Sequence, residues 1–390
     1  MSEIEKPHLS QFRNDGDSLT FRIENVNVSI VNGLRRTILA DIPVVCIHPD
    51  DITVSKNTTR INNEILKQRI ACIPVHMTYV SSKLPNYELE LVVENTEMHP
   101  KYVYTSDFRI RRVDTGKYLR QLNIGGEKMG IQNIFPKNRK TNGSIIISRV
   151  LPPLNGETDD YSRSGEELSL TAKMSVHTAK ENSSFNCASL CSYSMAVDEE
   201  RQSIAWEEYK AKHPVSADKQ DWYALEGKRV VRENVFDFMV ETVGVFTPKN
   251  IVVKACEVLN KRISDLYDKA QAGEVPVKNA KVNMVAYDII LEGHDYTIGK
   301  GIEHVIYEKY YKTNRLQFVG FKKFHPHDSF SVLRVMFADD ANKELSYEER
   351  FISEMADSDG KSKTMEVFID ALKELGDIYA SIGEKIKSGI

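Results

Sequence analysis

The chain has 390 residues, which at roughly 100–200 residues per domain predicts two or three domains. Its 52 Lys and Arg against 56 Asp and Glu give a formal net charge of −4, which argues against a protein that holds nucleic acid over its whole surface. A hydrophobic content of 41% suffices for real cores, and five cysteines exclude a disulfide scaffold and favour a reducing compartment. The sequence lacks both a run of about 18 apolar residues and the apolar core of a signal peptide, so we expect a soluble intracellular protein without a membrane span.

The chain begins with a strand and a short helix. Residues 18–28 alternate apolar and polar side chains, which predicts an edge-type strand. Residues 29–40 place apolar side chains on one helical face, with Ser29 as the expected N-cap and Pro43 as a stop after the helix. This pattern predicts an amphipathic helix of about three turns.

A β-rich region follows these elements. Residues 44–54 are typical of a strand with a turn in its middle, and residues 62–75 of a second short helix. Between 76 and 195, strand-like runs alternate with Gly, Pro and Asn clusters, which indicates a β-rich module with long loops. Residues 198–229 are highly charged, and we expect a surface insertion that is helical in pieces.

The rest of the chain alternates strands and helices. Residues 234–244 alternate as a strand, and 248–270 form a strong amphipathic helix with Pro248 in its first turn, where the missing N–H costs little. A turn-rich linker is expected at 271–281. Beyond it we expect a strand at 282–293, a helix at 297–314, two strands within 316–338 joined at 325–328, and a long terminal helix at 364–387.

A weak internal repeat relates the two ends of the chain. Each compared segment, 29–39 and 297–307, follows a strand and opens a helix, and each half ends in a long amphipathic helix. Five positions match in type: Ser29 with Thr297, Ile30 with Ile298, Gly33 with Gly301, Leu34 with Ile302, and Ile38 with Ile306. Two ordinary amphipathic helices would match in part by chance, and the shared order of elements favours the repeat.

The apolar stripes of these helices need a partner. A sheet of a few strands cannot cover the stripes of one half, whereas two halves packed face to face would bury them in a shared core. The sequence therefore predicts an α+β fold in which two related halves form an intramolecular pseudo-dimer rather than a homodimer. The expected interface consists of Ile30, Gly33, Leu34, Ile38, Leu39, Val252, Ala255, Leu259, Ile298, Gly301, Ile302, Ile306, Leu372 and Leu375.

Several motifs resemble the alpha-like subunits of DNA-directed RNA polymerase. Their signature helix resembles VNGLRRTILADIP, and their next helix resembles NNEILKQRIACIPV. Their return strand and dimerisation helix resemble FDFMVETVGVFTPKNIVVKA. The small partner of the alpha-like pair, the eleventh subunit, resembles GHDYTIGKGI and FVGFKKFHPHD. These segments lie at 31–43, 62–75, 236–255, 293–302 and 318–328. The alpha-like subunits include the bacterial alpha amino-terminal domain. In RNA polymerase II the large partner is the third-largest subunit and the small partner is the eleventh.

The resemblance implies a fusion of the large and small partners, similar to those of nucleocytoplasmic large DNA viruses. It implies a non-catalytic assembly platform for the two large polymerase subunits, with small polymerase subunits as further partners and DNA contacted only through the complex. It implies no cofactor. For a virus, it implies a location in the host cytoplasm or nucleus and in the virion. The expected domains are 1–55 with 230–272 for the large partner, 56–229 for a β-rich insert, 273–281 for the linker and 282–390 for the small partner.

The sequence departs from the family in two places. The small partner usually has Glu-Asp before its His or Thr and Asn after its Gly, whereas this chain has Gly293 to Tyr296 and Lys300 there. Some large partners carry a cysteine-rich zinc loop, whereas only Cys187 and Cys191 lie near each other here. A four-ligand zinc site is therefore not expected, and core packing is favoured over a redox role for this pair.

Other candidate residues leave alternatives open. Arg35 and Arg36 are either solvated helix charges or, as the resemblance implies, contacts to a large polymerase subunit, which we favour. Gly33 and Gly301 are costly inside helices, which close helix approach would explain better than mere tolerance. The GKG at 299–301 lacks the spacing of a phosphate loop.

Two rival functions rest on other residues. His294, His325 and His327 would serve a metal-dependent hydrolase, although the intervening proline makes a turn the better interpretation. The basic stretches 109–112 and 137–140 would serve an architectural DNA-binding module or touch an acidic partner, against the alternative of solvated loops.

Overall fold

The computed structural model describes residues 4–78, 84–124, 127–153, 165–214, 218–280, 282, 284–338 and 358–389. The chain divides into two compact units. Unit 1 comprises Met1–Leu39, Leu190–Glu241 and Pro248–Ile390, and unit 2 comprises Ala40–Ser189 and Thr242–Thr247.

The first sheet of unit 1 is four-stranded. Its apolar side chains, such as Phe21 and Phe238, are buried on one face, while Arg22 and Asp237 form a two-point ion pair at 2.7 and 2.9 Å on the other. The strand predicted within 18–28 is confirmed, but it is internal rather than at an edge, because an additional strand near the N-terminus pairs with it. The order is β1 (His8–Asn14), β2 (Ser18–Glu24), β15 (Val231–Thr242) and β14 (Ala188–Val197).

A second four-stranded sheet lies in the C-terminal part of unit 1. Its central strands pair antiparallel with Ile289 opposite Leu333, and the two predicted strands joined by a turn are confirmed. A short strand occupies part of the segment predicted as a turn-rich linker. The order is β16 (Val277–Asn279), β17 (Tyr287–Glu292), β19 (Phe330–Phe337) and β18 (Leu316–Lys322).

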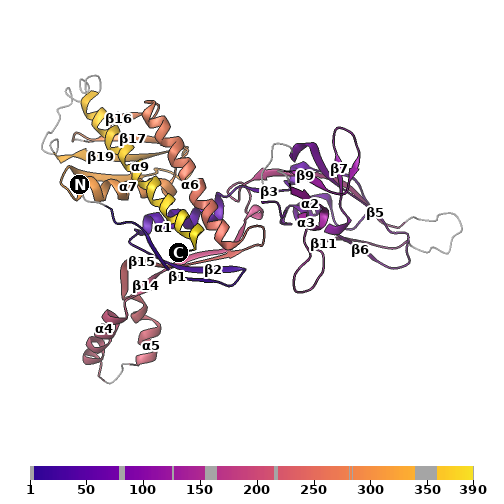
Figure 1. Ribbon diagram of the computed structural model, residues 1–390, viewed down its shortest axis with the longest axis horizontal. Helices are drawn as coiled ribbons and strands as arrows, with labels where there is room; N and C mark the ends of the chain where they lie inside the picture. The colour runs from indigo at the N-terminus through magenta and orange to yellow at the C-terminus, as the bar shows by residue number, and fades with distance from the viewer. Residues whose placement is uncertain are drawn as a thin grey trace. The chain divides into compact units, whose positions relative to one another are not determined.

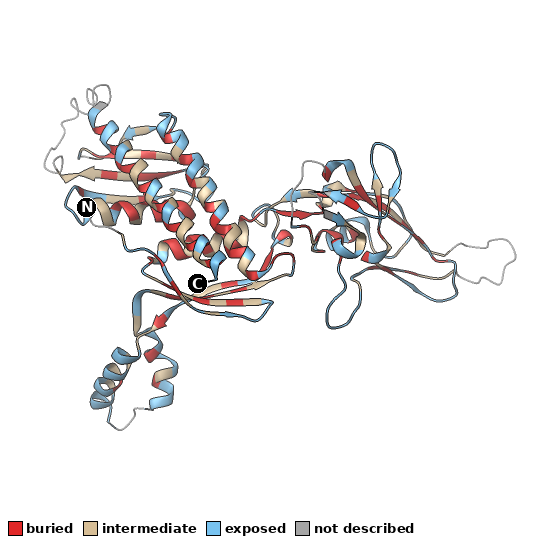
Figure 2. Cartoon of the chain, viewed as in Figure 1, coloured by how far each residue is buried: buried red, intermediate tan, exposed pale blue. Residues whose placement is uncertain are grey.

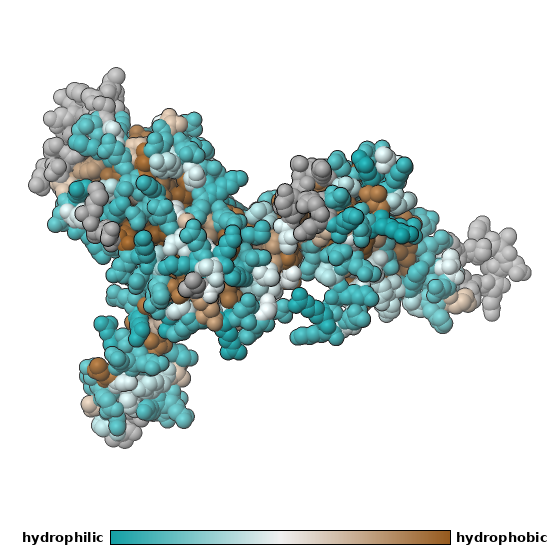
Figure 3. Space-filling model, in the orientation of Figure 1, coloured by the Kyte–Doolittle hydropathy of each residue, from teal (hydrophilic) through white to brown (hydrophobic). Residues whose placement is uncertain are grey.

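Helices complete unit 1, and both sheets lie against the same group of them (Figure 1). The buried residues of the two long helices form continuous stripes, as the amphipathic pattern predicts (Figure 2). The face drawn in Figure 3 is predominantly hydrophilic, as expected when the apolar stripes of the helices are buried in the interior. The helices are α1 (Val28–Ala40), α6 (Pro248–Gln271), α7 (Tyr296–Ile306), a π-helical turn (Tyr307–Tyr311) and α9 (Ser358–Ser388).

The charged insertion is helical in pieces, as predicted. It comprises α4 (Glu199–Lys212) and α5 (Lys219–Ala224), between β14 and β15. Two tryptophans hold it together: Trp206 and Trp222 are each 6% exposed, with ring centroids 5.5 Å apart. The insertion thus has a small aromatic core of its own.

Unit 2 consists mainly of strands. Its main sheet has the order β4 (Ile52–Asn57), β12 (Glu167–Lys173), β5 (Tyr87–Glu94), β7 (Arg109–Arg112) and β8 (Tyr118–Leu119). Three two-stranded sheets and two short helices surround it: β3 (Val44–Cys46) with β13 (Ser175–His177), β6 (Lys101–Tyr104) with β11 (Ile146–Val150), β9 (Leu122–Ile124) with β10 (Glu127–Met129), and the helices α2 (Asn63–Ala71) and α3 (Ile131–Ile134).

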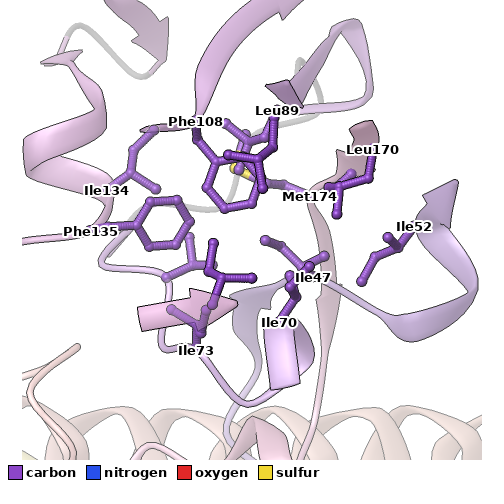
Figure 4. Packing of buried hydrophobic residues seen from close by; sticks show 14 of the residues in the cluster. Ile47, Ile52, Ile70, Ile73, Leu89, Phe108, Ile134, Phe135, Leu170 and Met174 are labelled. Atoms are coloured by element: carbon purple, nitrogen blue, oxygen red, sulfur yellow. The ribbon is translucent and has the colours of Figure 1, made fainter. Parts of the chain in front are cut away.

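One apolar cluster forms the core of unit 2. Side chains from its sheets and both short helices converge in it (Figure 4), and Phe108 and Phe135 lie with ring centroids 5.6 Å apart. Ile47, Leu89 and Leu170 are fully buried there. At roughly 1.5–3 kcal/mol per fully buried aliphatic or aromatic side chain, this core contributes substantially to the stability of the unit.

The units do not follow the domain boundaries expected from the sequence. Residues 44–55 were expected in the large partner's own domain, but they belong to unit 2, because β3 pairs with β13 and β4 with β12. Conversely, residues 190–229 belong to unit 1, because β14 joins the sheet of β15. None of the helices in the described part of the chain combines the length and apolar composition that crossing a membrane requires.

Candidate helix-pairing interface

The two helices of the sequence repeat begin in the same way. At the start of α1, Asn27 Oδ1 accepts hydrogen bonds from Ser29 N at 2.9 Å and from Ser29 Oγ at 2.7 Å. At the start of α7, Asp295 Oδ1 accepts one from Thr297 N at 2.9 Å. The capping residue thus stands two positions before the matched hydroxyl residue in both helices, and Ser29 is not itself the N-cap.

Gly33 lets α1 approach α7 and α9 closely. A Cβ atom at Gly33 would lie 2.5 Å from Tyr379 Oη and 2.8 Å from the backbone oxygen of Thr297. Gly301 is less confined, because the atoms nearest to a Cβ there belong to the side chain of Leu375, the first at 3.1 Å. Close approach therefore explains Gly33, as expected from the cost of glycine in a helix, and the obstacle there includes backbone.

The long helices α6 and α9 pack side by side in opposite directions (Figure 1). Gly383 lies against Cys256, and Gly376 lies against Ile263, so the contacts run along one helix as they run back along the other. This pattern is that of two helices packed antiparallel along their length.

The predicted interface residues gather in unit 1. Thirteen of the fourteen are buried, and Leu39, the last, is half-buried. The sequence does not predict Tyr379 and Cys256, which are buried in the same helices, or the capping residue Asp295 as members of this interface. The sequence does show that Tyr379 lies on the apolar stripe of the helix expected at 364–387, and this position could have indicated its burial.

Tyr379 joins the two ends of the chain by a buried hydrogen bond. Its hydroxyl donates to the backbone oxygen of Ile30 at 3.1 Å, across 349 residues of sequence. Burial raises the pKa of Tyr379, and burial also raises the pKa of Cys256 to about 12. Both groups are therefore neutral in the folded chain over a range in which an exposed tyrosine or cysteine would ionise.

These two groups predict alkaline sensitivity. An unfolded cysteine loses its proton near pH 8.5 and an unfolded tyrosine near pH 10, whereas the folded groups retain theirs, so stability is complete below those values and falls as pH rises. Each group should contribute a slope of up to about 1.4 kcal/mol per pH unit. Urea unfolding at pH 8, 9 and 10 should therefore show a shallower decline for Cys256→Ala than for wild type.

The matched control for this experiment is Cys72→Ala, because Cys72 is exposed. This variant should retain the wild-type slope between pH 8 and 10. Equal slopes for wild type, Cys256→Ala and Cys72→Ala would contradict the assignment of the effect to the buried thiol.

The two arginines of α1 have different surroundings. Arg36 Nε donates to Thr297 Oγ1 at 2.9 Å, and its Nη2 donates to Asp295 Oδ2 at 3.1 Å. Arg35 Nε donates to Asn32 Oδ1 at 3.1 Å within its own helix. Arg36 is thus already engaged by the helix that faces it, whereas Arg35 remains on its own helix.

The residues behind the rival functions lie elsewhere. His325 and His327 stand in the turn between β18 and β19 with ring centroids 5.2 Å apart. In the parts of the chain that the structure describes, no group of three or more His, Cys, Asp or Glu side chains is placed to hold a metal ion. Cys187 and Cys191 are both buried.

The basic stretch at 109–112 is largely neutralised. Arg111 forms ion pairs with Glu88 and Glu90, and Arg112 Nε lies 2.9 Å from Asp114. Two of the three arginines of this stretch therefore lie beside acidic side chains, and Arg109 is exposed. In the exposed stretch 137–140, Asn138 accepts hydrogen bonds from the backbone N–H of Lys140 and Thr141, which orders a turn.

Comparison with known proteins places the chain in a family. Residues 20–263 match the RNA polymerase Rpb3/Rpb11 dimerisation domain, more than half of the chain. The chain is 21% identical over 316 residues to the DNA-directed RNA polymerase II subunit rpb3 of Dictyostelium discoideum, which covers 69% of this chain and 96% of that protein.

Two further relatives are also subunits of DNA-directed RNA polymerases. The DNA-directed RNA polymerases I and III subunit RPAC1 of Bos taurus is 23% identical over 304 residues, 66% of this chain and 83% of the relative. The DNA-directed RNA polymerase subunit Rpo3 of Methanosphaera stadtmanae is 20% identical over 279 residues, 65% and 94% respectively. These findings support an alpha-like RNA polymerase subunit, and the chain belongs to the RNA polymerase Rpb3/Rpb11 dimerisation domain family.

Proposed function

We propose that the chain is a non-catalytic subunit of a DNA-directed RNA polymerase and that its two halves pair within one polypeptide. The observation that carries the proposal is the packing of α1 against Thr297 of α7 and of α6 against α9, in a chain whose first 263 residues contain the family match. The halves correspond to a large partner interrupted by the β-rich insert, and to a small partner that begins near residue 282. A single chain keeps such partners at high effective concentration.

The paired helices would then act as an assembly platform. In this role they present one surface to the two large catalytic subunits, and small polymerase subunits bind beside them. Arg35 is the better candidate for a large-subunit contact, because Arg36 already binds Asp295 and Thr297. DNA would be met only through the assembled enzyme, which agrees with a net charge of −4.

The experiment that tests this function is affinity purification of the full chain from the cells that produce it. Both large polymerase subunits should co-purify in stoichiometric amounts. Their absence, or stoichiometric zinc with hydrolase activity in the purified chain, would overturn the proposal. Salt-dependent duplex binding by the isolated chain would instead favour the DNA-binding alternative.

The source is part of the same proposal. The resemblance to fused alpha-like subunits suggests a nucleocytoplasmic large DNA virus, whose polymerase would be packaged in the virion. Mass spectrometry of purified virions should then detect this chain together with the large polymerase subunits. A chain found only in uninfected cells would exclude the viral origin and leave the polymerase function intact.

A further inference from the structure

The repeat places different residues at two equivalent positions. With Ser29 aligned on Thr297, Arg36 aligns with His304, and Asn27 aligns with Asp295. The matched caps at the starts of α1 and α7 support this register. The two halves therefore share their apolar contacts but differ at two positions. These are the capping residue, Asn27 or Asp295, and the residue seven positions after the hydroxyl residue, Arg36 or His304.

These positions meet in the folded chain. The Arg36 guanidinium binds the capping carboxylate of α7 at 3.1 Å and the adjacent Thr297 hydroxyl at 2.9 Å. The side chains of Arg36 and Asp295 are 42% and 32% exposed, so water screens the pair only in part. Because its donor and acceptor are both charged and the guanidinium makes two directed contacts, the interaction depends strongly on which residue stands opposite.

Other pairings would lose this contact. If the first halves of two copies paired, each Arg36 would face the neutral Asn27 and Ser29. If the second halves paired, each Asp295 would face His304, whose imidazole lacks the permanent charge and the forked donors of a guanidinium. Only a first half against a second half places a permanently charged guanidinium opposite a carboxylate.

We infer that the ion pair between Arg36 and Asp295 selects pairing of unlike halves over self-pairing of like halves. Apolar burial is non-directional, and Gly33, Leu34 and Ile38 have close counterparts in α7, so the shared stripe discriminates weakly between partners. Specificity then requires a contact that the wrong partner cannot make. The inference rests on the proposed intramolecular pairing and identifies the residues that enforce it.

The test measures self-association of the full-length chain by light scattering over a range of concentrations. Wild type should be monomeric, whereas Arg36→Gln and Asp295→Asn should each raise the dimer association constant, by roughly tenfold for a loss of about 1.4 kcal/mol. Asp295→Asn retains the ability to cap the helix, because Asn27 performs that role in α1. The combined variant should be no worse than either single variant, since both remove the same contact.

Charge reversal provides a rescue. Arg36→Glu alone sets two carboxylates face to face and should give the most self-association, and adding Asp295→Asn should reduce it. Arg35→Glu, with the same charge change on the same helix, should remain monomeric, because Arg35 bonds only within α1 among the contacts described.

Two results would overturn the inference. One is self-association of Arg36→Glu no greater than that of Arg35→Glu; the other is additive effects of Arg36→Gln and Asp295→Asn. Circular dichroism at each step separates misfolding from mispairing, and Arg36→Gln serves where Arg36→Glu fails to fold. If the chain fails to purify with polymerase subunits, the proposed function is rejected and the role of the ion pair in self-association is unaffected. If the self-association experiment fails, the ion-pair inference is rejected and the proposed function is unaffected.

Discussion

Replacing Leu34 with aspartate is expected to abolish the folding of unit 1 around α1 and, with it, co-purification with large polymerase subunits. Leu34 is fully buried in the helix that faces α7 and α9. The variant loses the apolar contacts of a leucine and buries a carboxylate with no designed partner, which together should cost at least about 4 kcal/mol. Since domains are stable by about 5–15 kcal/mol, this loss approaches the whole.

Hydrogen exchange provides the measurement. Amides of α1 and α9 should lose their protection in Leu34→Asp, because both helices depend on the same core. Leu34→Met is the matched control, since a volume-conserving apolar exchange costs less than about 1.5 kcal/mol. Retained protection in Leu34→Asp, or equal loss in both variants, would show that burial of an apolar side chain at this position is not what holds the helices together.

Gly33→Ala is expected to destabilise the chain even though alanine is the better helix former. The added methyl would stand within 2.8 Å of both the Tyr379 hydroxyl and the Thr297 carbonyl oxygen. Overpacking of this kind costs about 1–3 kcal/mol, and a gain of about 1 kcal/mol in helix propensity offsets only part of it, because a backbone carbonyl cannot rotate away. We expect a net loss of up to about 2 kcal/mol, measured by urea unfolding.

The same substitution at Gly376 is the control and should have the opposite sign. A Cβ there would make ordinary contact with Ile263 at 3.7 Å, in the interior of α9. Gly376→Ala should therefore stabilise the chain by about 0.5–1 kcal/mol through reduced backbone freedom in the unfolded state. Destabilisation by both variants would indicate a general intolerance of the helix pair, whereas stabilisation by both would refute close approach at Gly33.

Some features of the fold could not be predicted from local pattern. Strand β1 is polar along most of its length, and only its pairing with β2 makes it a strand. The strand at 277–279 lies within a turn-rich segment for the same reason. In both places, long-range hydrogen bonds outweigh a local preference that is weak, which is the usual situation for β-structure.

The candidate site was predictable in its apolar part and not in its polar part. Helical periodicity identified the buried stripes, since burial follows from spacing along one helix. It could not show that Arg36 binds a carboxylate 259 positions away, or that Tyr379 reaches the backbone of Ile30. A charged or hydroxyl side chain has many possible partners, and sequence spacing within one helix does not choose among them.

The sequence by itself determined the helices of unit 1, the apolar faces they bury, and the likeness between the two ends of the chain. These properties depend on side-chain size, polarity and spacing within a few turns. The tertiary structure decided that β14 joins β15, that β3 and β4 belong with the β-rich unit, and that Arg36 binds Asp295. The physical reason is that burial is non-directional, whereas strand pairing and ion pairing depend on which atoms meet.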